Sequence, residues 1–162
     1  MKIQILNCGG TLDKSYNPAR EILEHTQTHL AEILDQARIK NLEIKTEEVF
    51  LKDSLKMQKK DFQKVAQACE KSTNKKILVI HGTSKMVESA KHTANKKLEK
   101  TIVFFGAMIP YEFKKTDAMF NFGFALAALQ TLPHGVFITM NGQIFSYEEV
   151  KKNNTKAVFE RI

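Results

Sequence analysis

Short runs of apolar residues alternate along the chain with longer segments in which apolar residues recur every three or four positions. The short runs are rich in β-branched and aromatic residues and therefore predict buried strands, whereas the longer segments predict helices with one buried face. The predicted strands are residues 3–6, 49–51, 77–80, 102–105 and 136–140, and the predicted helices lie around residues 30–37, 62–69, 87–98 and 117–129. Asn141-Gly142 after the last of these strands predicts a tight hairpin into residues 143–145.

The regular alternation of strands and helices predicts an α/β fold. We expect a doubly wound, mostly parallel sheet with helices on both faces, a three-layer sandwich of the Rossmann or flavodoxin type. Because no internal repeat or linker-like tract interrupts the pattern, residues 1–162 are expected to form one domain. In such a sheet the loops that follow the parallel strands meet at one edge, where ligands bind. The chemistry of the protein is therefore expected in the polar residues that follow the strands.

Four of these strand ends carry polar or glycine-rich clusters. They are Gly9-Gly10-Thr11, Lys52-Asp53-Ser54, His81-Gly82-Thr83-Ser84 and Gly106-Ala107-Met108. Each cluster alone is typical of a turn or of a helix N-cap. Together they place hydroxyl groups, a carboxylate and accessible backbone N–H groups at one edge, which is what the hydrolysis of an amide needs. A phosphate site is disfavoured because neither GxGxxG spacing nor a Walker-type lysine is present.

The composition is that of an ordinary globular protein, with 43% hydrophobic and 27% charged residues. The net charge of +7 comes from lysines scattered along the chain, with few arginines, so it favours a solvated surface over a nucleic-acid interface. Cys8 and Cys69 lack partners at disulfide or metal-ligand spacing and are expected to be small buried side chains. No metal or cofactor is expected.

The sequence shows neither a secretory signal nor a membrane span. The N-terminal residues lack a sustained apolar stretch with a small-residue cleavage site. No later stretch approaches the roughly 18 apolar residues that cross a bilayer. We therefore expect a soluble, cytoplasmic protein without membrane or nucleic-acid partners.

Several of the clusters resemble signatures of the bacterial-type L-asparaginase family and occur in the family's order. Gly9-Gly10-Thr11-Leu12 is similar to its GGTI signature, and residues 81–88 are similar to HGTDTMEE. Residues 100–110 resemble KPVVxxGAMRP, residues 116–121 loosely match SDGPxN, residues 135–142 are similar to GVxVxMNG, and residues 150–153 resemble its sequel. The family's longer members continue into a smaller C-terminal domain. The resemblance therefore implies an asparaginase N-terminal domain over residues 1–162, with that smaller domain absent.

The resemblance also implies roles for individual residues. Thr11 would attack the side-chain amide carbon, and Tyr16, in a loop shorter than that of the long enzymes, would help to activate it. Thr83 would be the second threonine, paired with Lys100 in a proton relay. The backbone N–H groups of Thr11 and Thr83 would stabilise the oxyanion. His81 would form local hydrogen bonds without acting as a base.

The substrate-binding positions include the main departure from the family. Asp53 and Ser54 occupy the position that holds the substrate's α-carboxylate, with Ser54 as the hydroxyl donor. Ser84 stands where the family has the aspartate that binds the α-ammonium and completes the relay, and Lys85 and Ile109 replace a threonine and an arginine. Loss of such a charged hydrogen bond costs about 1.5–3 kcal/mol. Ser84 is therefore expected to weaken the binding of free asparagine.

The favoured hypothesis is an asparaginase-like amidohydrolase that releases ammonia from asparagine or a related small amide through a threonine nucleophile. The alternative is a catalytically weakened homologue that acts as an amino-acid-binding or regulatory protein. A third hypothesis is an enzyme whose substrate lacks a free α-ammonium, such as an acylated amino acid or a larger amide. Because family members pair domains across subunits, the resemblance also implies a homo-oligomer, with a dimer as the expected form.

Overall fold

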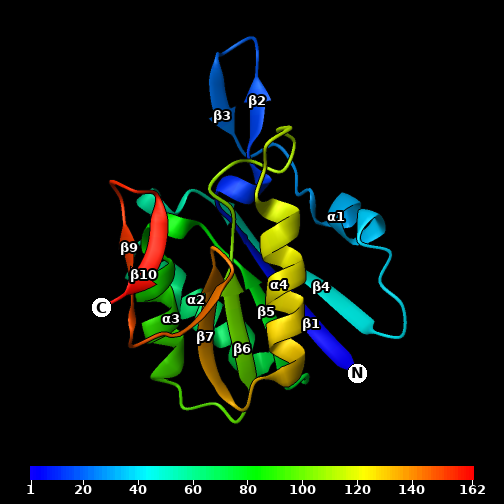
Figure 1. The fold of residues 1–162 in the computed structure, drawn as a ribbon, viewed down its shortest axis with the longest axis vertical. Helices are drawn as coiled ribbons and strands as arrows, with labels where there is room; N and C mark the ends of the chain where they lie inside the picture. The colour runs from blue at the N-terminus through cyan, green and yellow to red at the C-terminus, as the bar shows by residue number, and fades with distance from the viewer.

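The computed structural model describes residues 1–162 and is built around a six-stranded sheet (Figure 1). Its strands, in spatial order, are β4 (Glu43–Lys52), β1 (Lys2–Gly9), β5 (Lys76–Ile80), β6 (Thr101–Phe105), β7 (Gly135–Met140) and β8 (Gln143–Ser146). The first five are parallel to one another, and β8 returns antiparallel to β7. The predicted α/β fold with a mostly parallel sheet is therefore confirmed.

Two helices cover each face of the sheet and complete the three layers (Figure 1). α1 (Leu30–Gln36) and α4 (Ala118–Thr131) pack on one face, whereas α2 (Lys59–Lys71) and α3 (Met86–Ala94) pack on the other. None of these helices is both long enough and apolar enough to cross a bilayer.

The central strands are buried on both faces, which explains their continuous apolar sequences. In β5, Ile77 packs in the core layer against α2 and α3, while the next residue, Leu78, packs in the layer against α1 and α4. Full burial of such a side chain contributes about 1.5–3 kcal/mol to stability. Cys8 and Cys69 lie in the α2–α3 layer as free, buried thiols, which confirms the expectation from their sequence context.

Element boundaries differ from the sequence prediction mainly where strands are exposed. β4 extends over ten residues, well beyond residues 49–51, because it is an edge strand whose first half carries charged and polar side chains. α3 ends at Ala94 rather than near residue 98. Two further hairpins have no counterpart in the prediction, because their strands are only three or four residues long. They are β2 (Ser15–Asn17) with β3 (Ile22–Glu24), and β9 (Val150–Asn153) with β10 (Val158–Arg161).

The hairpin predicted after the last parallel strand is confirmed. Asn141 and Gly142 have φ angles of 54° and 69°, and a two-residue turn of type I′ requires positive φ at both positions. Met140 pairs with Gln143 across this turn, so β8 extends the sheet beside β7.

The turns that follow β1 and β5 touch backbone to backbone. Gly10 follows β1 with a φ of +89°, and a Cβ on it would lie 2.4 Å from both N and Cα of Gly82. Glycine is needed here because a side chain would collide with this backbone and because other residues rarely adopt such a φ. Short 3₁₀ turns begin beside the contact at Thr11 and at Thr83, and a third, Ser54–Lys56, follows β4. The contact therefore gathers the ends of three neighbouring strands.

We expect Gly10→Ala to destabilise the fold strongly and Gly123→Ala to stabilise it slightly. Alanine at position 10 adds a backbone clash to an unfavourable φ, a combination expected to cost more than about 2 kcal/mol. A Cβ on Gly123, within α4, meets nothing within 4 Å, so alanine there should gain about 0.5–1 kcal/mol of helix propensity. Urea unfolding of both variants measures the difference, and equal stabilities would contradict the contact between the two turns.

Candidate functional site

The turns after β1, β4 and β5 carry predicted site residues and meet at the carboxyl edge of the sheet. Ser54 is 2% exposed, and its Oγ accepts a hydrogen bond from the backbone N–H of Ser84 at 3.1 Å. Ser54 also packs against Gly82, whose backbone contacts Gly10 next to Thr11. The structure therefore brings these three turns together around the contact between the two glycines.

A lysine to which the sequence prediction assigns no role contacts the second threonine. Nζ of Lys152, in β9, donates a hydrogen bond to Oγ1 of Thr83 at 2.8 Å. Thr83 is 5% exposed, and partial burial of Lys152 lowers the pKa of its amine from the ordinary value. An amine with a lowered pKa beside a buried hydroxyl is suited to receiving a proton from it and returning it.

Lys100, the predicted partner of Thr83, lies at the opposite edge of the sheet, so the predicted pairing is wrong. Its Nζ donates hydrogen bonds at 2.6, 2.9 and 2.7 Å to three carbonyl oxygens at the end of α2, those of Cys69, Glu70 and Ser72. Lys100 therefore caps the C-terminus of α2. The physical reason is its position before β6: a residue that precedes a parallel strand lies at the amino edge of the sheet, away from the turn of Thr83.

The position of Lys152 depends on packing that a local sequence pattern does not display. Val150 in β9 and Phe159 in β10 are buried in the same core layer as α3, and this packing fixes the hairpin against the sheet. Residues two apart in a strand share a face, so Lys152 lies on the buried side with Val150, while Lys151 is exposed. This alternation over residues 150–152 is too short to be decisive, and the resemblance of residues 150–153 to a family signature assigns Lys152 no role.

Tyr16 lies on the β2–β3 hairpin, which projects beyond the carboxyl edge of the sheet (Figure 1). The residue is 51% exposed, and its backbone N–H donates a hydrogen bond to Oε1 of Glu112 at 2.6 Å. The structure does not bring its hydroxyl into hydrogen-bond contact with Thr11. Its part in activating Thr11 stays a prediction.

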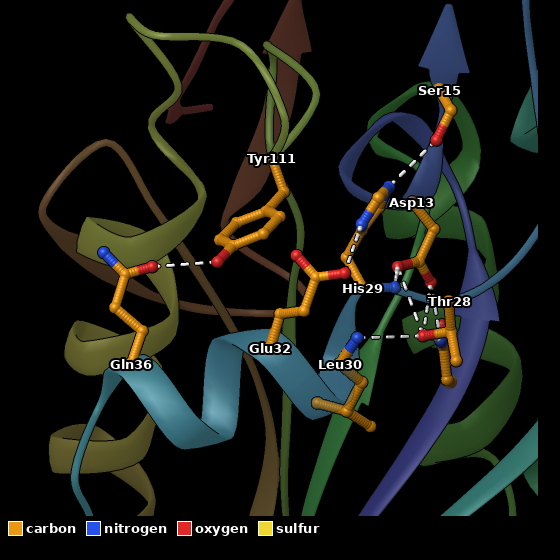
Figure 2. A network of polar contacts seen from close by, with 9 residues as sticks. Asp13, Ser15, Thr28, His29, Leu30, Glu32, Gln36 and Tyr111 are labelled. Atoms are coloured by element: carbon orange, nitrogen blue, oxygen red, sulfur yellow. Dashed lines mark hydrogen bonds and ion pairs between the residues drawn. The ribbon is translucent and has the colours of Figure 1, made fainter.

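A buried carboxylate holds the turn that follows β1. Asp13 is fully buried and accepts hydrogen bonds from the side chains of Asn7 and Thr28. The backbone N–H of His29 donates a further bond to it at 2.8 Å. Figure 2 shows Asp13 facing Thr28 at the start of α1, with the His29 ring reaching the hydroxyl of Ser15 at 3.0 Å. This network ties the turn to β1, to α1 and to the β2–β3 hairpin.

Both carboxylate oxygens of Asp53 are already engaged. Oδ1 accepts the backbone N–H of Leu55 at 2.9 Å, and Oδ2 pairs with the amine of Lys14. Partial burial acts to raise the pKa of Asp53, but the two hydrogen bonds and the charge of Lys14 together outweigh it and hold the pKa below the ordinary value. Asp53 is therefore ionised and neutralised by a partner, and it shapes the loop that carries Ser54.

His81, at the end of β5, is neutral near pH 7. Its Nδ1–H donates to the carbonyl oxygen of Gly82 at 2.8 Å, and the ring packs edge-on against Phe104. Burial lowers the pKa of the ring to about 4, and Nε2 has no hydrogen-bond partner. The ring thus makes a local hydrogen bond through Nδ1–H and is not protonated at Nε2 near neutral pH.

Two open cavities flank the meeting point of the three turns. One, of about 350 Å³, is lined by Ser84 and Lys152 together with residues of α3. The other, of about 400 Å³, lies between β3 and the end of β4 and is lined in part by Asp53. Neither Thr11 nor Thr83 lines either cavity. No three His, Cys, Asp or Glu side chains are grouped so that they could hold a metal ion.

Comparison with known families assigns this chain to one family. The sequence profile described as asparaginase, N-terminal, matches residues 2–160. The chain belongs to the asparaginase N-terminal domain family. No curated protein matches it by sequence.

Three solved structures share the fold of this asparaginase N-terminal domain. The thermostable L-asparaginase from Thermococcus kodakarensis matches 100% of the chain with a TM-score of 0.87 and 19% identity. L-asparaginase I from Vibrio cholerae matches 99% with a TM-score of 0.85 and 19% identity, and a probable cytoplasmic L-asparaginase from Campylobacter jejuni matches 99% with 0.82 and 22%. The match covers 51% of each of those chains, so this chain spans about half their length. At these identities the likeness shows the fold alone.

The buried ring of His81 predicts a pH dependence of stability. Its pKa is about 4 in the folded protein and near 6.5 when unfolded, so the unfolded state binds an extra proton between these values. The stabilisation from the neutral ring is complete above pH 6.5 and is lost as the pH falls toward 4, by about 3 kcal/mol.

Urea unfolding between pH 7 and pH 4 measures this dependence. The free energy of unfolding should fall less steeply with decreasing pH in His81→Leu than in the wild type, whatever the absolute stability of the variant. His134→Gln, at an exposed position, should keep the wild-type slope. An unchanged slope in His81→Leu would contradict the assignment of the neutral ring.

Proposed function

We propose that this asparaginase N-terminal domain hydrolyses the side-chain amide of asparagine or a related small amide and releases ammonia, with Thr11 as the nucleophile. The observation that carries the proposal is the hydrogen bond from Lys152 to Thr83, beside the turn that begins at Thr11. A hydroxyl nucleophile needs a base and a route for its proton, and this pair supplies both. Family membership over nearly the whole chain supports the same reaction.

In the proposed reaction, Oγ1 of Thr11 forms a bond to the amide carbon while its proton passes to Lys152 by way of Thr83. Collapse of the tetrahedral intermediate breaks the carbon–nitrogen bond, and the proton leaves with the nitrogen as ammonia. Water then attacks the acyl ester, which releases the carboxylic acid and restores the Thr11 hydroxyl. The backbone N–H groups of Thr11 and Thr83 would stabilise the oxyanion in both steps.

The loop after β4 supports substrate binding in this proposal. The Ser54 hydroxyl accepts the N–H of Ser84, so its own hydrogen is left to donate to a carboxylate of the substrate. Asp53 holds the amine of Lys14 beside this loop. The pair is neutral overall, so Asp53 does not leave an uncompensated negative charge that would repel the expected carboxylate.

Ser84 favours a second candidate function, an amino-acid-binding or regulatory protein with little turnover. A serine hydroxyl offers no charge to pair with a substrate ammonium and no carboxylate to complete the relay. Calorimetric binding of asparagine without any ammonia release would support this second function over the first. We also propose that the protein is cytoplasmic and forms a homodimer, as expected from the sequence.

Two lysines allow a matched test of the proposed site. Thr11→Ala should abolish ammonia release, and Lys152→Met should lower its rate by about 10²-fold or more, because general acid–base catalysis contributes about 10²–10⁴-fold. Lys100→Met makes the same substitution at the amino edge and should leave the rate unchanged. It should instead lower the free energy of unfolding by about 1–3 kcal/mol, because three carbonyls lose their donor.

The measurements are ammonia release from asparagine, glutamine and N-acylated asparagines, and urea unfolding of each variant. A normal rate in folded Lys152→Met protein would contradict the proposed relay. So would a lost rate in Lys100→Met protein that is still folded.

A further inference from the structure

The cavity of about 350 Å³ opens directly beside the proposed relay. Ser84, which follows Thr83 in the chain, and Lys152, which is hydrogen-bonded to it, both line this cavity. Cavities of roughly 300 Å³ and more hold whole small ligands. The cavity is therefore larger than the cleaved amide group and has room for a further part of the substrate.

The polar lining of the cavity is mainly cationic. Lys91 and Lys151 contribute ammonium groups beside the relay amine of Lys152, and Glu88 contributes the one carboxylate side chain. Glu160 offsets part of the charge of Lys151 in an exposed pair at 3.7 Å. A carboxylate placed beside Lys91 and Lys151 is attracted by both, whereas an ammonium is repelled by both.

The lining also includes uncharged polar groups, and its walls are partly apolar. Ser84 offers a hydroxyl there, and the neighbouring Lys85 is committed elsewhere because its Nζ donates to the carbonyl oxygen of Met57 at 2.7 Å. Val87 and Val150 add apolar surface to the lining. A substituent that matches this lining is uncharged at the atom that joins it to the amide substrate. It has an aliphatic chain and ends in an anionic group.

We propose that the substrate carries, on its α-nitrogen, an acyl group that ends in a carboxylate, and that this acyl group occupies the cavity. The inference rests on the proposed function for the amide that is cleaved, and it adds the substrate class. Acylation removes the positive charge that Ser84 does not pair, and the terminal carboxylate lies among Lys91 and Lys151. The bonds formed and broken in the reaction are unchanged.

Ammonia release from three matched amides tests this inference. N-succinyl-L-asparagine carries the terminal carboxylate, N-butyryl-L-asparagine has the same acyl length without it, and L-asparagine has no acyl group. kcat/KM should fall in that order, by about ten-fold or more between the first and the last. Faster hydrolysis of L-asparagine than of both acylated amides would overturn the inference and leave the proposed function in place.

Charge reversal at one lysine localises the effect to the cavity. Lys91→Glu should lower the preference for the succinyl over the butyryl amide by about five-fold or more, and added salt should shrink the wild-type preference. Lys64→Glu makes the same charge change on α2, outside this cavity, and should leave the preference unchanged. Equal effects of the two variants would mean that net charge decides the preference, and this would overturn the inference.

A binding measurement separates the inference from the proposed function. Titration calorimetry on Thr11→Ala protein, which lacks the proposed nucleophile, should show tighter binding of N-succinyl-L-asparagine than of L-asparagine. That binding order, with no ammonia release by the wild type, would support the assignment of the cavity and overturn the proposed function. No binding of N-succinyl-L-asparagine at millimolar concentration would overturn the inference.

Discussion

The close approach of Gly10 to Gly82 is the contact on which the rest of the site depends. A Cβ on Gly10 would lie 2.4 Å from the backbone of Gly82, and a Cβ on Gly82 would lie 2.5 Å from Oγ of Ser54. Side chains at these positions would push apart the ends of β1, β4 and β5, and with them the hydroxyl groups of Thr11 and Thr83. The absence of side chains at Gly10 and Gly82 therefore allows the strand ends, and the proposed site that they carry, to lie close together at the edge of the sheet.

Of the ionisable groups around this contact, Lys152 is the one whose side chain is hydrogen-bonded to a threonine of the proposed site. His81 is neutral because burial lowers its pKa to about 4, and Asp53 is ionised and paired with Lys14. Lys152 differs from both, because its amine is hydrogen-bonded to the hydroxyl of Thr83 and partial burial lowers its pKa. Proton transfer in the proposed reaction therefore depends on an amine supplied by the β9–β10 hairpin, outside the main sheet.

Sequence reasoning locates the parts of the site that follow from strand order. Residues 77–80 are recognisable because a strand buried on both faces has a continuous apolar sequence, and Thr83 is placed at the ligand-binding edge because it follows that strand. Lys100 shows the limit of a motif match, because it precedes its strand and therefore lies at the other edge. Lys152 depends on a short polar strand whose position is set by the packing of Val150, and this tertiary contact leaves almost no periodic signal in the sequence.

The claim that Thr83 and Lys152 act as one proton relay is tested most directly by a double-variant cycle. Ammonia release is measured for the wild type, Thr83→Val, Lys152→Met and the double variant, with the amide that the wild type hydrolyses fastest. If either substitution alone already removes the relay, the double variant should be within about two-fold of the slower single variant. A double variant slowed by the product of the two single effects would contradict the account.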